Sequence, residues 1–344
     1  MDDNIKTHNK SRNIGRKILT ALAICFAVMI LILIGARLYF RIPVSGYYKN
    51  SEKGFKIPDI NKGFIPQGLA YDERSECFFV TGYMKDKSAS PIYIVRKSDG
   101  TCIKKLLMRN PDGSEFHGHA GGMTVHGEYL YVAGSSSHCL YVFGYGEAMS
   151  LNDGDIITSI GTVDMPDELR VAYVGSDADL LYSGEFFREK GYPTDETHKM
   201  TTNAGDYNQA LIYAYRFTDD KDSLFGLSPD PVEAYSIPDQ VQGMAVKDGR
   251  LYLSTSYGTA FSHILVYNKP VSTGTFSVSG ISLPLYELDS ASLAEDHRFP
   301  PMAEEIVFVD GKMYVMSESA SNKYIFGKLT SSFWCYATDM DRLK

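Results

Sequence analysis

The sequence predicts an all-β protein, a β-propeller of four-stranded blades closed by an N-terminal strand and preceded by one transmembrane helix. Three observations predict it: an uncharged apolar run near the N-terminus, a strand–turn–strand pattern that recurs along the rest of the chain, and an unpaired strand ahead of the first repeat. Repeats of this length, each too small to bury its own apolar face, are typical of propellers.

The apolar run extends from Ile18 to Ala36 without a charge, and Thr20 is its one polar interruption. At about 1.5 Å of rise per residue, it matches the hydrocarbon thickness of a bilayer. Because basic residues precede it, the positive-inside rule places the N-terminus in the cytoplasm and the rest outside. We therefore expect a basic cytoplasmic tail (1–17), a membrane helix (18–40), a linker (41–52) and an extracytoplasmic propeller domain (53–344).

Two other interpretations of this segment are weaker. A cleaved signal peptide usually has an apolar stretch of about 7–15 residues and a small-residue cleavage site, whereas this run is longer and lacks a clear site. A lipoprotein would use Cys25, but Ile24 does not suit such a site and much of the apolar run follows it. The sequence therefore favours an uncleaved anchor in the cell membrane.

Charge is divided unevenly along the chain. The net charge of −8 separates into +5 for residues 1–42 and −13 for the remainder. An acidic domain repels phosphate, so nucleic acid is not expected as a partner, while solubility or cation binding would suit the acidity. The four cysteines outside the anchor either stay as buried thiols or form two disulfides, with three possible connectivities; they are Cys77, Cys102, Cys139 and Cys335.

Each repeat begins with a small or polar entry and an apolar strand, continues through a tight turn, and returns in a second strand. Dipeptides such as Asp248-Gly249 and Asp310-Gly311 supply the positive φ angles of a type I′ hairpin turn. A third strand follows in most repeats. The repeated entries read 66–71 (PQGLAY), 120–125 (AGGMTV), 241–246 (VQGMAV) and 303–308 (AEEIVF), and a fifth repeat spans about 171–215.

The ends of the repeat pattern indicate a closed ring. The segment Gly54–Ile57 resembles a fourth strand with no preceding three, whereas the last repeat, Glu304 to Asp341, lacks an evident fourth. A circular molecule resolves both facts, because the N-terminal strand then completes the last blade and removes an exposed edge. We predict five blades, with six as the alternative if the insertion or residues 268–298 form another. A pair of β-sandwiches would not explain the repeated turns.

In a propeller the innermost strands start around a central channel, so their entry residues converge on one mouth. Here those positions carry Gln67, Gln242, Glu304 and Glu305, with His119 close to another. The loops after the second strands add Glu185 and Glu318. We predict that Gln67, His119, Glu185, Gln242 and Glu318 bind a ligand, although the two glutamines would equally suit a structural role in satisfying backbone groups.

The adjacent carboxylates are the groups at this mouth that suit acid/base catalysis or metal binding. Glu304 or Glu305, together with His119, are the candidates for acid/base catalysis. Glu305 is also the candidate metal ligand, with Ca²⁺ the suitable ion because it prefers oxygen donors, but no sequential calcium loop is present. The polar insertion Arg188–Asn208 is a second candidate region, as a binding loop or as a tolerated surface insertion.

The string Gln67-Gly68-Leu69, with its following hairpin, resembles the five-bladed glutaminyl cyclases (glutamine cyclotransferases) of plants and bacteria, which close an N-terminal glutamine into pyroglutamate. The blade pattern also resembles the six-bladed strictosidine-synthase and paraoxonase-like group, often calcium-dependent, where Glu precedes the glycine. The resemblance spans the domain as architecture but covers few residues as motif, and Gln242-Gly243 repeats it. No catalytic role is carried over.

The sequence thus indicates a membrane-anchored, extracytoplasmic propeller that binds a ligand or partner at its central mouth. The alternative is a propeller enzyme, a hydrolase or glutaminyl-cyclase-like catalyst, that could depend on a divalent cation. A third hypothesis is a cell-envelope assembly protein that uses the propeller rim. No G-x-S-x-G, H-E-x-x-H or glycine-rich phosphate loop is present to decide between them.

Overall fold

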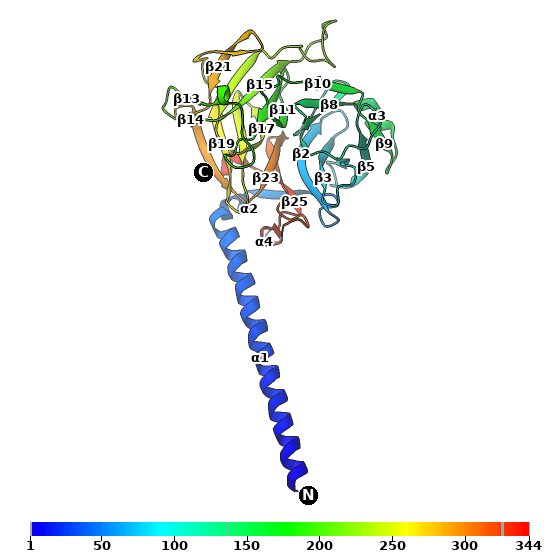
Figure 1. Cartoon of the computed structure of the whole chain (residues 1–344), viewed down its shortest axis with the longest axis vertical. Helices are drawn as coiled ribbons and strands as arrows, with labels where there is room; N and C mark the ends of the chain where they lie inside the picture. The colour runs from blue at the N-terminus through cyan, green and yellow to red at the C-terminus, as the bar shows by residue number, and fades with distance from the viewer. Residues whose placement is uncertain (1, 136, 325–326, 344) are drawn as a thin grey trace. The chain divides into compact units, whose positions relative to one another are not determined.

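The computed structural model describes residues 2–135, 137–324 and 327–343. It divides into two compact units, Met1–Ser45 and Gly46–Lys344. The first unit is dominated by helix α1 (Asp2–Arg41), which Figure 1 shows as one uninterrupted helix, followed by the short turn η1 (Ile42–Val44). Within the described residues, one helical stretch, 15–49, is long and apolar enough to span a membrane.

The second unit is a five-bladed β-propeller, and strands from every blade are labelled in Figure 1. Blade 1 contains β2 (Phe64–Asp72), β3 (Cys77–Met84), β4 (Pro91–Arg96) and β5 (Cys102–Arg109), with β9 (Ile156–Thr158) added outside. Blade 2 contains β6 (Ala120–His126), β7 (Tyr129–Gly134), β8 (Cys139–Gly144) and β10 (Gly161–Asp164).

Blade 3 contains β11 (Val171–Ser176), β12 (Leu180–Glu185), β15 (Ala210–Arg216) and β16 (Glu233–Ile237). Blade 4 contains β17 (Val241–Lys247), β18 (Arg250–Thr255), β19 (Ser262–Asn268) and β22 (Leu293–Phe299). Blade 5 contains β23 (Ala303–Val309), β24 (Lys312–Ser317), β25 (Trp334–Thr338) and β1 (Ser51–Lys56). Short helices lie between strands: α2 (Ser45–Lys49), α3 (Tyr145–Ser150), α4 (Gly327–Thr330), η2 (Glu196–His198) and η3 (Met340–Arg342).

The predicted closure by the N-terminal strand is confirmed. Strand β1 pairs antiparallel with β25, so the first strand of the domain is the outermost strand of the last blade. Phe55 in β1 is almost fully buried and packs on Phe78 of blade 1, with ring centroids 4.9 Å apart. The closing strand therefore contributes a core side chain as well as backbone hydrogen bonds, as a closed ring requires.

The sixth blade that the sequence left open is not formed in the described residues. Residues 269–292 instead form the hairpin β20 (Gly274–Val278) and β21 (Ile281–Glu287), which leaves blade 4 and extends blade 3 through a parallel pairing of β21 with β16. The insertion after β12 carries η2 and the two-residue strands β13 (Met200–Thr201) and β14 (Tyr207–Asn208).

The hydrophobic core lies between neighbouring blades. One cluster joins blades 1 and 2, with Phe79 facing Met123, and another joins blades 2 and 3, with Tyr131 and Leu181. The predicted type I′ turns form at Asp248-Gly249 and Asp310-Gly311, where both residues have positive φ. The turns bring β17 and β23 back in register, so each blade presents one apolar face to each neighbour.

Close packing around the axis explains why the entries contain glycine. A Cβ on Gly122 would lie 2.5 Å from the Val174 nitrogen, and a Cβ on Gly68 would lie 2.8 Å from the Gly122 carbonyl carbon. Both distances are well inside contact distance, so only glycine allows the innermost strands to approach this closely.

Candidate functional site

A bulge interrupts all five innermost strands at the same point of the repeat. The register with the second strand shifts at Gln67, at Gly121 and Gly122, at Ala172, at Gln242, and at Glu304 and Glu305. A bulge adds an unpaired residue and re-aims its side chain. These bulged residues include Gln67, Gly121, Ala172, Gln242 and Glu304, all of which line one cavity.

This cavity, the mouth, has a volume of about 300 Å³, which is at the lower end of small-molecule sites. All five blades contribute to its walls, as expected from the convergence of the innermost strands. Beyond the bulged residues, it is lined by Tyr83, His119, Ser135, Arg170, Val171, Phe186, Tyr192, Ser256, Tyr257, Gly258, Met302, Glu318, Lys323 and Tyr324.

Glu304 is the most unusual group in the mouth. It is only 2% exposed, yet its carboxyl group has no hydrogen-bond or ion-pair partner among the described residues. Burial raises its pKa well above the ordinary value, and the neighbouring Glu318 and Glu305 raise it further, while Lys323 opposes them. Burial without a partner favours the protonated form of a carboxyl group and leaves it with unused hydrogen-bonding capacity.

Glu318 lies on the same side and is held by protein partners. Gln67 Nε2 donates to its Oε2 at 3.3 Å, and Tyr324 also hydrogen-bonds to it. Burial raises the pKa of Glu318 to about 7, against the opposing effects of Lys323, Tyr324 and Gln67. The pKa values of Glu304 and Glu318 are therefore both raised, and Gln67 Nε2 contacts one oxygen of Glu318.

Aromatic rings and a lysine form the adjoining wall. His119 stacks on Tyr83, with ring centroids 3.8 Å apart, and its pKa is lowered by burial and by Lys323. Lys323 Nζ donates to the Tyr83 hydroxyl and lies 5.1 Å from the Tyr324 ring centroid. His117, two residues before His119, is outside this wall and contacts Glu115 at 3.3 Å. The two histidines thus face different surroundings, as expected for an extended segment.

Glu305 does not line the mouth. It lines a separate cavity of about 140 Å³ along the axis, formed by innermost strands. Its Oε1 accepts from the Met244 amide at 2.9 Å and the Ile306 amide at 3.3 Å, while Oε2 is buried without a partner. Burial raises its pKa well above the ordinary value despite those two amides. The bulge in β23 therefore sends consecutive carboxyl groups into two different cavities.

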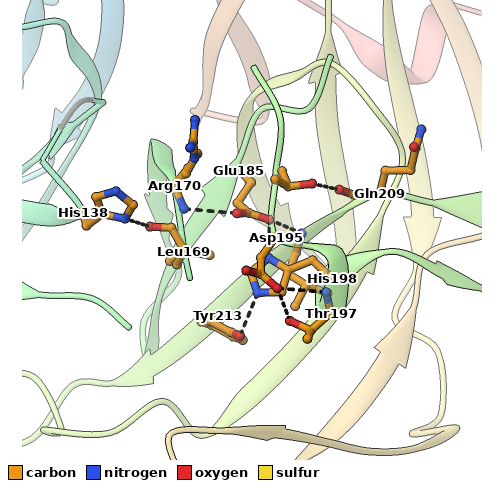
Figure 2. Close-up of polar contacts among 11 residues, drawn as sticks. His138, Leu169, Arg170, Glu185, Asp195, Thr197, His198, Gln209 and Tyr213 are labelled. Carbon is orange, nitrogen blue, oxygen red and sulfur yellow. Dashed lines mark hydrogen bonds and ion pairs between the residues drawn. The ribbon is translucent and has the colours of Figure 1, made fainter. Parts of the chain in front are cut away.

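Glu185 also does not line the mouth. It is fully buried behind the mouth, where Oε1 accepts from the Arg170 amide at 3.1 Å and Oε2 accepts from the Leu211 amide at 3.0 Å. His198 Nδ1 lies 2.8 Å from Oε2, as Figure 2 shows, and Tyr213 approaches the other ring nitrogen at 3.5 Å. These contacts fasten the insertion Arg188–Asn208 to blade 3.

The insertion also supplies part of the mouth. Tyr192 lines it and meets the Phe186 ring edge-on at 5.1 Å, while Arg188 stacks on Tyr257 at 4.0 Å. Sequence reasoning singled out the insertion that contains Tyr192, but it missed Tyr83, Arg170, Lys323 and Tyr324. Tyr83 lies near the end of β3 and Arg170 lies just before β11, so proximity to the ends of the repeat strands was the available signal. Lys323 and Tyr324 lie in a loop with no repeat signal.

No group of three or more His, Cys, Asp or Glu side chains that could hold a metal ion occurs in the part of the chain that the structure describes. The candidate ligand Glu305 is the single carboxyl group of the axial cavity. Calcium prefers six to eight oxygen ligands, so carbonyl groups and water would have to supply the rest. All five cysteines are free thiols in this structure.

Comparisons with known proteins give architecture only. No family model matches the sequence, and no curated protein matches it. Solved structures that resemble it include the glutaminyl cyclase of Myxococcus xanthus, with a TM-score of 0.44, 10% identity, and coverage of 84% of this chain and 93% of that one. The PQQ-bound aldose sugar dehydrogenase of Streptomyces coelicolor has a TM-score of 0.43, 16% identity, and coverage of 80% and 92%.

The resemblance to glutaminyl cyclases that the sequence indicated is thus also found among solved structures, at the level of architecture. At these identities and TM-scores, the similarities carry no argument about activity, substrate or cofactor. The class of protein that the chain's own strand pairing defines is a five-bladed β-propeller with an N-terminal helix able to span a membrane.

Proposed function

We propose that this protein is a membrane-anchored, extracytoplasmic binding propeller that holds a small polar ligand in its central mouth. The observation that carries the proposal is Glu304, a carboxyl group that is 2% exposed, lines a cavity of about 300 Å³ and has no partner among the described residues. Leaving a buried polar group unpaired costs about 1–3 kcal/mol. A ligand that hydrogen-bonds to Glu304 would recover that free energy.

The neighbouring groups support the same proposal. The Gln242 amide and the Ser256 hydroxyl also line the mouth without a side-chain partner among the described residues, and they come from a different blade than Glu304. Convergent polar groups in an otherwise aromatic cavity are the usual form of a small-molecule site. The extracytoplasmic placement rests on the basic flank before the anchor, as argued from the sequence.

A thermal-shift screen of the full chain in lipid nanodiscs tests this proposal. We expect a subset of a library of small polar metabolites to raise the melting temperature of the native protein. The same compounds should give a smaller shift with Gln242→Ala, because that substitution removes a mouth amide, and an unchanged shift with Glu73→Gln, because Glu73 is an exposed turn residue. If the library gives no shift, or equal shifts in all three proteins, ligand binding at the mouth is contradicted.

One observation favours an enzyme as the second candidate. Glu318, with its pKa of about 7, lines the same cavity as Glu304, whose pKa is also raised, and a general acid or base works best with a pKa near the operating pH. Glutaminyl-cyclase-like activity is tested by incubating the full chain with a peptide that begins with glutamine. Ammonia release by the native protein but not by Glu304→Gln would support the enzyme. No ammonia release by the native protein would exclude this reaction.

A further inference from the structure

The free hydrogen-bonding groups of the mouth define what it can recognise. Glu304 and Gln242 line the mouth and make no side-chain hydrogen bond among the described residues, and Ser256 Oγ is buried without a partner. Between them they offer a carboxylic acid, an amide and a hydroxyl group, and each of these can both donate and accept. A ligand that satisfies them must carry several hydroxyl or amide groups in different directions.

The charges around these groups disfavour an ionic ligand. Burial raises the pKa of Glu304 well above its ordinary value, and it raises the pKa of Glu318 to about 7. Two cationic side chains, Lys323 and Arg170, line the same cavity. A cation would approach the charges of Lys323 and Arg170, whereas an anion would lie beside two buried carboxyl groups that already resist ionisation.

Apolar surface faces the same space. Tyr192 and Tyr257 line the mouth and are 52% and 41% exposed, and Phe186 packs against Tyr192. Aromatic faces next to polar groups suit a ligand with an apolar side and a polar rim. A sugar ring has this form, with C–H bonds on its faces and hydroxyl groups around its edge. A cavity of about 300 Å³ has room for one ring and its substituents, not for a folded partner.

We infer that the mouth takes a neutral sugar ring, whose hydroxyl groups hydrogen-bond to Glu304 and Gln242 and whose face packs on the tyrosines of the insertion side. This inference deepens the proposed function and rests on it. The roles are divided between elements: β23 and β17 supply the polar contacts through their bulges, and the insertion and the loop after β18 supply Tyr192 and Tyr257.

Saturation-transfer NMR on the full chain in lipid nanodiscs, free of sugar detergents, tests the inference. The neutral probes are the methyl glycosides of glucose, galactose, mannose and N-acetylglucosamine. The charged probes are glucosamine, glucuronate and the dipeptide amide Gln-Gly-NH₂. We expect transfer to the ring protons of at least one neutral glycoside, with binding about tenfold weaker in Glu304→Met, which keeps the side-chain length without the carboxyl group, and in Gln242→Ala, in line with the loss of about one buried hydrogen bond. Glu73→Gln should bind like the native protein.

The other outcomes separate the two proposals. If a charged probe binds in a Glu304-dependent way and the neutral glycosides do not, the sugar assignment is wrong while the mouth remains a binding site. If a neutral glycoside binds equally to the native protein, Glu304→Met and Gln242→Ala, it binds elsewhere and the inference is overturned. If no probe shows transfer, the sugar assignment is overturned, and the metabolite screen decides separately whether the mouth binds at all.

Discussion

At the scale of single residues, two glutamates with raised pKa values share one cavity. Glu318 has a pKa of about 7 and Glu304 one well above its ordinary value. A raised carboxyl pKa means that the folded state holds more protons than the unfolded state between the unfolded and the folded pKa. Folding stability is therefore fully present below the unfolded pKa and declines as pH rises toward the folded pKa.

This decline of stability with rising pH gives the first prediction. The melting temperature of the native protein should fall between pH 5 and pH 7.5. The melting temperature of Glu318→Gln should fall less, because the amide keeps the shape of the side chain and has no charge to bury. The substitution also removes a negative neighbour of Glu304. The measurement is the melting temperature of both proteins across that range, with Glu73→Gln as control. Parallel curves for Glu318→Gln and the native protein would contradict the raised pKa of Glu318.

Several mouth residues were predictable from the sequence, and the reason is the repeat. Gln67 and Gln242 occupy the same place in two blades, so recognising the repeat placed both at the mouth. Glu304 and Glu305 could not be separated in this way, because a bulge, invisible in the pattern, decides which of them faces the mouth. Glu185 was expected at the mouth by analogy with Glu318, but buried backbone amides and His198 hold it behind the wall.

At the scale of elements, the closing strand β1 joins the last blade to the first, and buried contacts hold the insertion to blade 3. Phe55 in β1 is 1% exposed and packs between blades 5 and 1, whereas its neighbour Lys56 is exposed. The core cluster that Phe55 enters also contains Phe78 and Cys335, from the two blades that the ring must join. Ring closure therefore depends on this side chain.

Phe55→Ala should lower the free energy of unfolding by about 3–5 kcal/mol, as for other large-to-small substitutions in a core. Lys56→Ala should change it by less than about 0.5 kcal/mol, since exposed substitutions usually have little effect. Urea denaturation of the full chain, followed by circular dichroism, measures both. Equal, small effects would mean that β1 does not hold the ring closed.

The insertion is fastened by a pair of fully buried side chains, His198 and Glu185. His198→Ala would leave the Glu185 carboxylate with two backbone donors and no side-chain partner, and breaking a buried pair in this way costs about 3–5 kcal/mol. We expect faster trypsin cleavage after Arg188, Lys190 and Lys199. The exposed pair His263 and Asp296 provides the control, because His263→Ala should cost at most about 1 kcal/mol. Unchanged cleavage in His198→Ala would show that other contacts hold the insertion.

At the scale of the whole molecule, the five-bladed ring and the apolar helix were both predictable. The helix was predictable because a run of nineteen uncharged, largely apolar residues is typical of a membrane span. The ring was predictable because turn dipeptides recur at fixed points of the repeat. The hairpin β20–β21 could not be assigned, because its strands pair with blade 3 while the sequence places them inside blade 4. Pairing between distant segments leaves no local pattern.

Membrane orientation gives a whole-molecule prediction. In a chain whose native cysteines are replaced by serine or alanine, Val271→Cys should react with a membrane-impermeant maleimide in intact cells, because Val271 is 86% exposed in the propeller domain. Thr7→Cys, in the basic N-terminal tail, should react only after the cells are opened. The reverse pattern would place the propeller in the cytoplasm.

The claim at the centre of this account is that Glu304 contacts a ligand in the mouth. The most direct test is isothermal titration calorimetry with the compound that gives the largest thermal shift, which measures its dissociation constant for the native full chain, Glu304→Met and Glu73→Gln. We predict binding about tenfold weaker for Glu304→Met, which lacks the carboxyl group, corresponding to about 1.4 kcal/mol, and unchanged binding for Glu73→Gln. Equal dissociation constants in all three proteins would show that the ligand does not contact Glu304, and the central claim would be wrong.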